Sequence, residues 1–255
     1  MRFVLVHGGA HGAWCWDKLI PELHRLGHEA VAMDLPGHGD RRDEQATLAG
    51  YRDAIVEVLT PDDVLVGHSM GCCPATIAAD AFPAIRHVVY IAGPIPVEGE
   101  TIAFASGASG EADGGALMAK AEGAEQYIRL LDGGARFTFD PDDARRCFYH
   151  DCPDDVAAWA AERITPQQTA VLATEAVHVS RFWAADLPRS YIRCTEDRAF
   201  PARLSRGPVE RLGVEELTIA SGHFPQLSRP ADLAGLLIRA VDTKPVGKLL
   251  PRWPV

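Results

Sequence analysis

The stretch VLVGHSMGCC, residues 64–73, decides the fold of this chain. It matches the pattern Gly-x-Ser-x-Gly, with Ser69 between Gly67 and Gly71. A serine at the tip of a sharp turn from strand to helix needs glycine on both sides, because the backbones approach closely there. The stretch therefore predicts a buried strand, a turn that exposes the Ser69 hydroxyl, and a helix. Such a turn also aims the backbone N–H of Met70 at a developing oxyanion.

Strand and helix patterns alternate on both sides of this turn. Apolar runs that end in glycine or turn residues predict strands, and apolar positions at helical spacing predict helices. The expected strands lie near 2–9, 29–39, 62–69, 86–93, 190–197 and 214–222, and the expected helices at 14–26, 48–59, 70–82 and 230–241. This alternation is typical of an α/β fold, with a mostly parallel six-stranded sheet flanked by helices.

One long segment interrupts the alternation between the fourth and fifth strands. It opens with a Gly/Ala/Ser-rich stretch at 103–116 and then shows helical patterns. The patches with helical patterns lie near 117–131, 140–149, 153–163 and 166–173. We expect residues 94–188 to form a mostly helical cap, and residues 1–93 with 189–255 to form the core domain.

A serine hydroxyl needs a base, which is usually a histidine, and the histidine needs an acid that fixes its tautomer. In this topology the base follows the last strand, where GHFP places His223. The acid follows the strand before it, where Glu196 and Asp197 are adjacent. We prefer Asp197, which lies further into the loop. The chain order Ser69, Asp197, His223 is that of the α/β-hydrolases.

The loop after the first strand, HGGAHG, is expected to complete an oxyanion hole. Adjacent glycines let the backbone turn sharply and present an N–H group, so Gly9 is the candidate and Met70 its partner. The alternative to an oxyanion hole is that Gly8 and Gly9 only form a tight turn. His7, His11 and His68 are interpreted as structural or pocket-lining residues.

Composition narrows the functional classes further. The chain has 255 residues, 47% hydrophobic and 24% charged, with a net charge of −10. The acidic balance argues against nucleic acid or an anionic membrane as the main partner. The chain start has no signal-peptide pattern, so a cytoplasmic protein with six reduced cysteines is expected. Since no ligand cluster is visible, we expect no metal and no organic cofactor.

Several stretches together resemble the α/β-hydrolase superfamily. They are residues 3–39, GHSMGC at 67–72, YIRCTEDRAFP at 191–201, GHFPQLSRP at 222–230 and FYHDCPDDVAAWA at 148–160. More narrowly, they are similar to the branch of plant methylesterases, plant hydroxynitrile lyases and bacterial esterases. The resemblance implies the triad Ser69, Asp197 and His223, with the N–H groups of Gly9 and Met70 as oxyanion hole. The lyases carry threonine and lysine where this chain has Gly8 and Phe224.

These observations predict a serine carboxylesterase that acts on a small or medium apolar ester through an acyl-enzyme. Alternatives are a lactone hydrolase, a carbon–carbon lyase on the same triad, and a ligand receptor without catalysis. The expected partner is a small-molecule ester, and a homodimer is compatible with these features. The candidate pocket residues are His11, Trp14, Phe148, Tyr149, Phe182, Trp183 and Phe224.

Overall fold

The computed structural model describes residues 1–106 and 126–249. At its centre is a six-stranded sheet in the order β2-β1-β3-β4-β8-β9, and every neighbouring pair runs parallel. The strands are β1 (Arg2–Val6), β2 (Glu29–Met33), β3 (Val64–His68), β4 (His87–Ile91), β8 (Arg189–Cys194) and β9 (Leu217–Ile219). This sheet confirms the predicted α/β fold.

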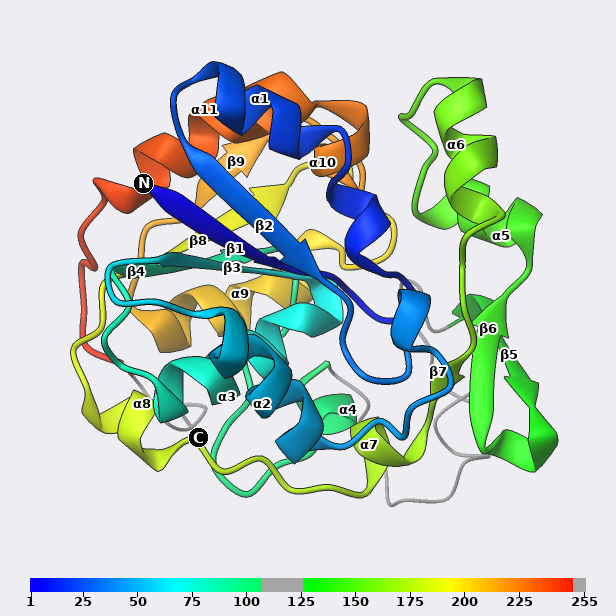
Figure 1. The fold of residues 1–255 in the computed structure, drawn as a ribbon, viewed down its shortest axis with the longest axis horizontal. Helices are drawn as coiled ribbons and strands as arrows, with labels where there is room; N and C mark the ends of the chain where they lie inside the picture. The colour runs from blue at the N-terminus through cyan, green and yellow to red at the C-terminus, as the bar shows by residue number, and fades with distance from the viewer. Residues whose placement is uncertain (107–125, 250–255) are drawn as a thin grey trace.

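Helices cover both faces of the sheet (Figure 1). On one face lie η1 (Ala13–Trp16), α1 (Leu19–Arg25), α10 (Pro225–Ser228) and α11 (Pro230–Val241). On the other face lie α2 (Leu48–Val58), α3 (Cys72–Ala81), α8 (Ser180–Ala184) and α9 (Ala202–Leu212). Two further short turns are η2 (Gly39–Arg41) and η3 (Ser69–Gly71).

Helix α9 was not expected from the sequence. Gly207 and Pro208 lie within it, and both residues weaken a helix, because glycine is flexible and proline lacks the N–H donor. The helix nevertheless continues to Leu212 and ends at Gly213, which takes the left-handed conformation with φ 60°. Packing against β8 therefore outweighs the local preference.

The segment between β4 and β8 is less helical than expected. Besides α8, it contains α4 (Ile102–Ala105), β5 (Ile128–Leu131), η5 (Asp132–Gly134), β6 (Arg136–Phe139), α5 (Pro141–Cys147), α6 (Asp154–Ala161), β7 (Gln167–Gln168) and α7 (Ala170–Ala173). Strands β5, β6 and β7 form a small antiparallel sheet. The helix predicted over 117–131 is wrong at Ile128–Leu131, which pairs with β6, and its residues 117–125 lie outside the described residues.

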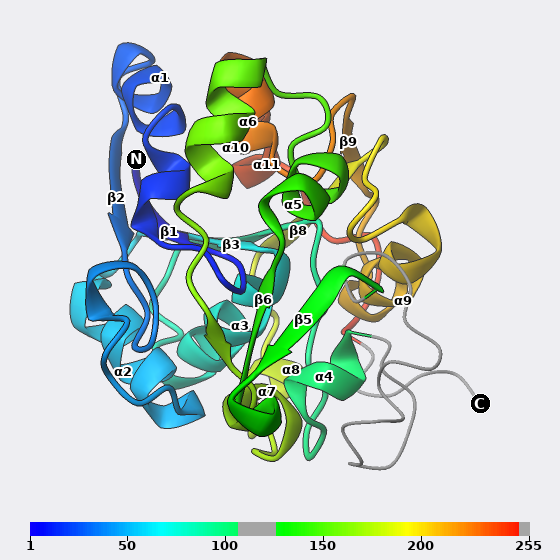
Figure 2. The same ribbon diagram turned by 90° about the vertical axis from the view of Figure 1, so that its right-hand side faces the viewer.

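This inserted segment lies at one end of the central sheet. In Figure 1 the strands β1 and β2 point toward the side on which β5, β6, α5 and α6 lie, and Figure 2 faces that side. The insertion therefore stands over the carboxyl ends of the parallel strands. This is the edge where open α/β sheets bind ligands.

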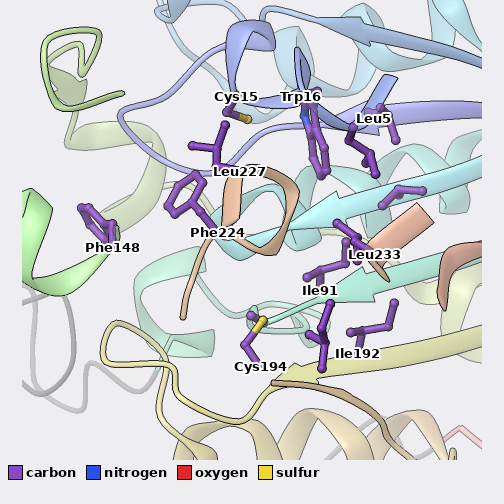
Figure 3. Packing of buried hydrophobic residues seen from close by; sticks show 14 of the residues in the cluster. Leu5, Cys15, Trp16, Ile91, Phe148, Ile192, Cys194, Phe224, Leu227 and Leu233 are labelled. Atoms are coloured by element: carbon purple, nitrogen blue, oxygen red, sulfur yellow. The ribbon is translucent and has the colours of Figure 1, made fainter. Parts of the chain in front are cut away.

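The core consists of two apolar clusters, one on each face of the sheet. In Figure 3 the first cluster joins Leu5, Ile91 and Ile192 of the strands to Trp16 and Leu233 of the flanking segments. The six cysteines all lie in the described part of the chain, and none forms a disulfide. Within the described ranges, no helix has the length and apolar character to span a membrane.

The first prediction concerns this core. Ile192 is fully buried in β8, so Ile192→Ala removes packed atoms and leaves a cavity. We expect the free energy of unfolding in urea to fall by about 2–5 kcal/mol. Val246→Ala is the control, because Val246 is 66% exposed, and it should change the stability little. An equal loss in both variants would contradict the burial of Ile192 in the core.

Candidate active site

Ser69 stands on a strained turn between β3 and α3. Its φ is +53°, in the left-handed region that residues other than glycine rarely adopt. Glycine is required around it: a Cβ on Gly71 would lie 2.3 Å from the His7 carbonyl oxygen, and one on Gly93 would lie 2.1 Å from the Ser69 carbonyl oxygen. The turn therefore holds the Ser69 hydroxyl at the end of the strand.

His223 bridges Ser69 and Asp197 in one hydrogen-bonded chain. Its Nε2 lies 2.9 Å from Ser69 Oγ, and its Nδ1 lies 2.7 Å from Asp197 Oδ2. The second oxygen of Asp197, Oδ1, accepts the backbone N–H groups of Ala199 and Phe200, both at 2.8 Å. His223 is 2% exposed and Asp197 8%. The carboxylate is thereby fixed with one oxygen toward the imidazole.

His68, which precedes the serine, holds the backbone of His223. Its Nε2–H donates to the His223 carbonyl oxygen at 2.7 Å, and its Nδ1 accepts from Gln226 Nε2 at 3.2 Å. Burial lowers the pKa of His68 well below its usual value, so the ring stays neutral and this tautomer fits both contacts. The sequence indicated His68 as a structural or pocket-lining residue, but it gave no indication of its partner Gln226.

The loop after β1 is bound by residues of the insertion. Ala10 has φ 61°, its carbonyl oxygen accepts the Thr165 N–H at 2.9 Å, and its N–H donates to Gln167 Oε1 at 3.2 Å. A Cβ on Gly8 would lie 2.8 Å from Ser69 Cβ. Gly8 is therefore a glycine because the loop passes directly beside Ser69.

His11 fixes the next part of this loop. Burial lowers its pKa to about 3, so the ring is neutral. Its Nδ1–H donates to the Gly9 carbonyl oxygen at 2.6 Å, and its Nε2 accepts from the Tyr149 hydroxyl at 2.5 Å. The orientation of the peptide after Gly9 therefore depends on a side chain of the insertion.

Ser69 opens into a cavity of about 220 Å³. Gly9 and Met70 line it beside the serine, and most of the other lining side chains are apolar. The larger of these are Ile102, Ile128, Leu130, Phe137, Phe139, Phe148, Leu172, Phe200, Leu204 and Phe224. No Lys, Arg, Asp or Glu is among the described lining residues, and the described ranges contain no group of three His, Cys, Asp or Glu that could hold a metal ion.

Three of the predicted pocket residues line this cavity, and four do not. His11, Phe148 and Phe224 line it, and Figure 3 shows Phe148 and Phe224 reaching toward each other from the insertion and from the loop after β9. The exceptions are Trp14, Tyr149, Phe182 and Trp183.

Each exception has a physical reason. The Trp14 ring packs against His11 and Trp159, and the Tyr149 hydroxyl is held by His11. Phe182 and Trp183 lie in α8, which packs against α3, and the Phe182 N–H donates to Asp80. The alternating aromatic residues of β6, Phe137 and Phe139, were the signal that could have indicated the lining instead.

Comparison with known proteins agrees with this geometry. Residues 3–236 match the model of the family described as the alpha/beta hydrolase family. The chain belongs to that family. It is 31% identical to Methylesterase 7 of Arabidopsis thaliana, over 94% of this chain and 96% of that protein. It is 27% identical to polyneuridine aldehyde esterase of Rauvolfia serpentina, over 95% of this chain and 96% of that protein. The crystal structure of a pyrethroid hydrolase from Sphingobium faniae JZ-2 shares the fold, with a TM-score of 0.79 and 22% identity. The match covers 95% of the present chain and 98% of the pyrethroid hydrolase.

The second prediction concerns pH and stability. His11 is neutral in the folded hydrolase down to about pH 3, whereas in the unfolded chain it gains a proton below about pH 6.5. Its contribution to stability is therefore complete above pH 6.5 and is lost as the pH falls from 6.5 toward 3, by about 1.4 kcal/mol per pH unit.

Urea unfolding between pH 7 and pH 4.5 measures this loss. The decline should be shallower in His11→Gln than in the wild type. His24→Gln removes an exposed histidine of α1 and serves as the control. A wild-type decline that His11→Gln leaves unchanged would contradict the burial of a neutral His11.

Proposed function

We propose that this hydrolase is a serine esterase for small or medium neutral apolar carboxylic esters. The observation that carries the proposal is the continuous chain from Ser69 Oγ through His223 to Asp197 at the wall of an apolar cavity. The two relatives named above as esterases support the ester as the substrate bond. Residues 94–188 would act as the cap over this cavity.

The reaction follows from the positions of these groups. Ser69 Oγ attacks the acyl carbon while His223 Nε2 takes its proton, and Asp197 stabilises the imidazolium. The N–H groups of Gly9 and Met70 bind the oxyanion. His223 then gives the proton to the departing alkoxy oxygen, which leaves as the alcohol. Water repeats the sequence on the acyl-enzyme and releases the acid.

The walls of the cavity favour a neutral substrate. The phenyl rings of Phe148 and Phe224 lie against the His223 ring, with centroids 5.7 Å and 5.3 Å away, and reduce the access of water to the reacting atoms. With no cationic side chain among the described lining residues, a carboxylate on the substrate would lose its hydration without a partner. A lactone fits the same requirement, because it is an internal ester.

A carbon–carbon lyase on this triad is less well supported. Phe224 follows the base where the lyases that this chain resembles carry lysine, and its ring offers no charge to a leaving anion. At position 8 a side chain would lie 2.8 Å from Ser69 Cβ, so the threonine of those lyases does not fit this loop. Both residues favour hydrolysis.

The third prediction tests the nucleophile. Ser69→Ala should lower kcat for p-nitrophenyl butyrate by about 10⁴-fold or more, because the three residues act as a unit. Ser180→Ala, at an exposed serine of α8, is the matched control and should behave as the wild type. Hydrolysis by Ser69→Ala at the wild-type rate would end the proposal.

The fourth prediction tests the charge of the substrate. A short alkyl ester should be hydrolysed with a kcat/KM about 10²-fold or more above that of the same ester with a terminal carboxylate, since burial of an unpaired ion costs several kcal/mol. Steady-state rates for matched pairs of neutral and ionised esters measure this ratio. Equal rates would contradict a substrate site that disfavours charge.

A further inference from the structure

Residues 149–151 of the insertion contact all three loops that surround Ser69. They follow α5 and its C-cap Phe148, and in Figure 2 this helix lies above the β5–β6 pair and below α6. We infer that Tyr149, His150 and Asp151 are positioning residues, which hold the oxyanion loop, the Asp197 loop and the His223 loop in register. The inference rests on the proposed esterase function, for which these three loops supply the reacting groups.

Asp151 holds the loop of the base. Its Oδ2 accepts the backbone N–H of Gly222 at 2.7 Å, and Gly222 is the residue directly before His223. The other oxygen, Oδ1, is buried without a hydrogen-bond partner in the described part of the chain. The Oδ2 contact fixes the backbone directly before His223, so the position of this loop depends on Asp151.

The absence of a side chain at Gly222 leaves space for the Asp151 carboxylate. Its backbone is not left-handed, so glycine is needed for space and not for its φ angle. A Cβ at this position would lie 2.4 Å from Asp151 Oδ1 and 2.9 Å from His150 Nε2. The two side chains therefore close over the point where the His223 loop begins.

His150 holds the loop of the acid. Its Nε2 lies 3.0 Å from the carbonyl oxygen of Glu196, which directly precedes Asp197. Neighbouring residues of the insertion thus fix the backbone on the amino-terminal side of both His223 and Asp197. His150 and Asp151 thereby support the direct backbone bond between the two loops, in which the Glu196 N–H donates to the Ser221 carbonyl oxygen at 3.0 Å.

Tyr149 completes the set at the oxyanion loop. Its hydroxyl donates to His11 Nε2, and the opposite ring nitrogen of His11 donates to the Gly9 carbonyl oxygen. The direction of the peptide between Gly9 and Ala10, which is adjacent to the peptide that carries the Gly9 N–H, therefore follows the position of Tyr149. Since a misplacement of about 1 Å at reacting groups can lower a rate about 10²-fold, the insertion sets catalytic geometry as well as cavity shape.

Asp151 gives the sharpest test. Asp151→Ala removes the acceptor for the Gly222 N–H, while Asp151→Asn keeps one carbonyl oxygen in reach of it. Asp154→Ala is the matched control, because the Asp154 side chain is fully exposed on α6, with Arg145 3.6 Å away. Rates with p-nitrophenyl butyrate are divided by the concentration of reactive Ser69, which is measured by titration with a neutral p-nitrophenyl alkylphosphonate.

We expect Asp151→Ala to lower kcat about 10- to 100-fold with KM within about twofold of the wild type. Asp151→Asn should recover most of kcat, and Asp154→Ala should match the wild type. The low-field proton resonance of the His223–Asp197 hydrogen bond should shift in Asp151→Ala only. A normal kcat per reactive Ser69 in Asp151→Ala, or an equal loss in Asp151→Asn, would overturn the inference.

Gly222→Ala tests the same contact from the other side, including the case in which Asp151→Ala does not fold. It must displace Asp151, so it should lower kcat similarly, and the double variant should be no slower than the slower single one. A normal kcat in Gly222→Ala, or fully additive losses, would overturn the inference. If the wild type reacts with the phosphonate but hydrolyses no ester, the esterase proposal fails, and the phosphonylation rates of the variants still test the positioning.

Discussion

Ser69 takes a left-handed backbone conformation where β3 ends, and the surrounding structure is built to keep it there. A single residue in this region costs roughly 1–2 kcal/mol. Close approach at Gly67, Gly71 and Gly93 leaves no room for the turn to relax, because a side chain at any of them would meet backbone atoms. The helix, the loop after β1 and the end of β4 all pack against this point. Without the left-handed conformation of Ser69, its hydroxyl would not face the cavity.

Neutral histidines hold the loops around this turn through hydrogen bonds. His68, His11 and His7 are buried, and burial lowers the pKa of each. A neutral imidazole has one donor and one acceptor, so it can join two backbone or side-chain groups and leave no buried polar atom unsatisfied. His7, for example, contacts the Gly8 carbonyl oxygen and accepts the N–H of Leu35. These rings connect the loops around Ser69 and His223 without adding charge to an apolar site.

The insertion after β4 serves two structural purposes at once. Strands β5 and β6 supply apolar walls for the cavity, while Thr165 and Gln167 bind both polar groups of the Ala10 backbone. Cavity shape and loop position therefore depend on the same element. This arrangement explains why buried polar side chains are found at the junction between the insertion and the sheet, where apolar packing alone would be simpler.

The sequence by itself determined the alternation of strands and helices, the turn at Ser69, and the chain order that places Asp197 and His223 after the last two strands. These features are local: they depend on residue spacing and on glycine at fixed offsets. It did not determine which aromatic residues face the cavity, and Phe182 was expected there although it packs against α3. Nor did it indicate the contact of Asp151 with Gly222, which are 71 residues apart. Only the tertiary structure decides such contacts, because the direction of a side chain across a fold depends on the packing of distant segments.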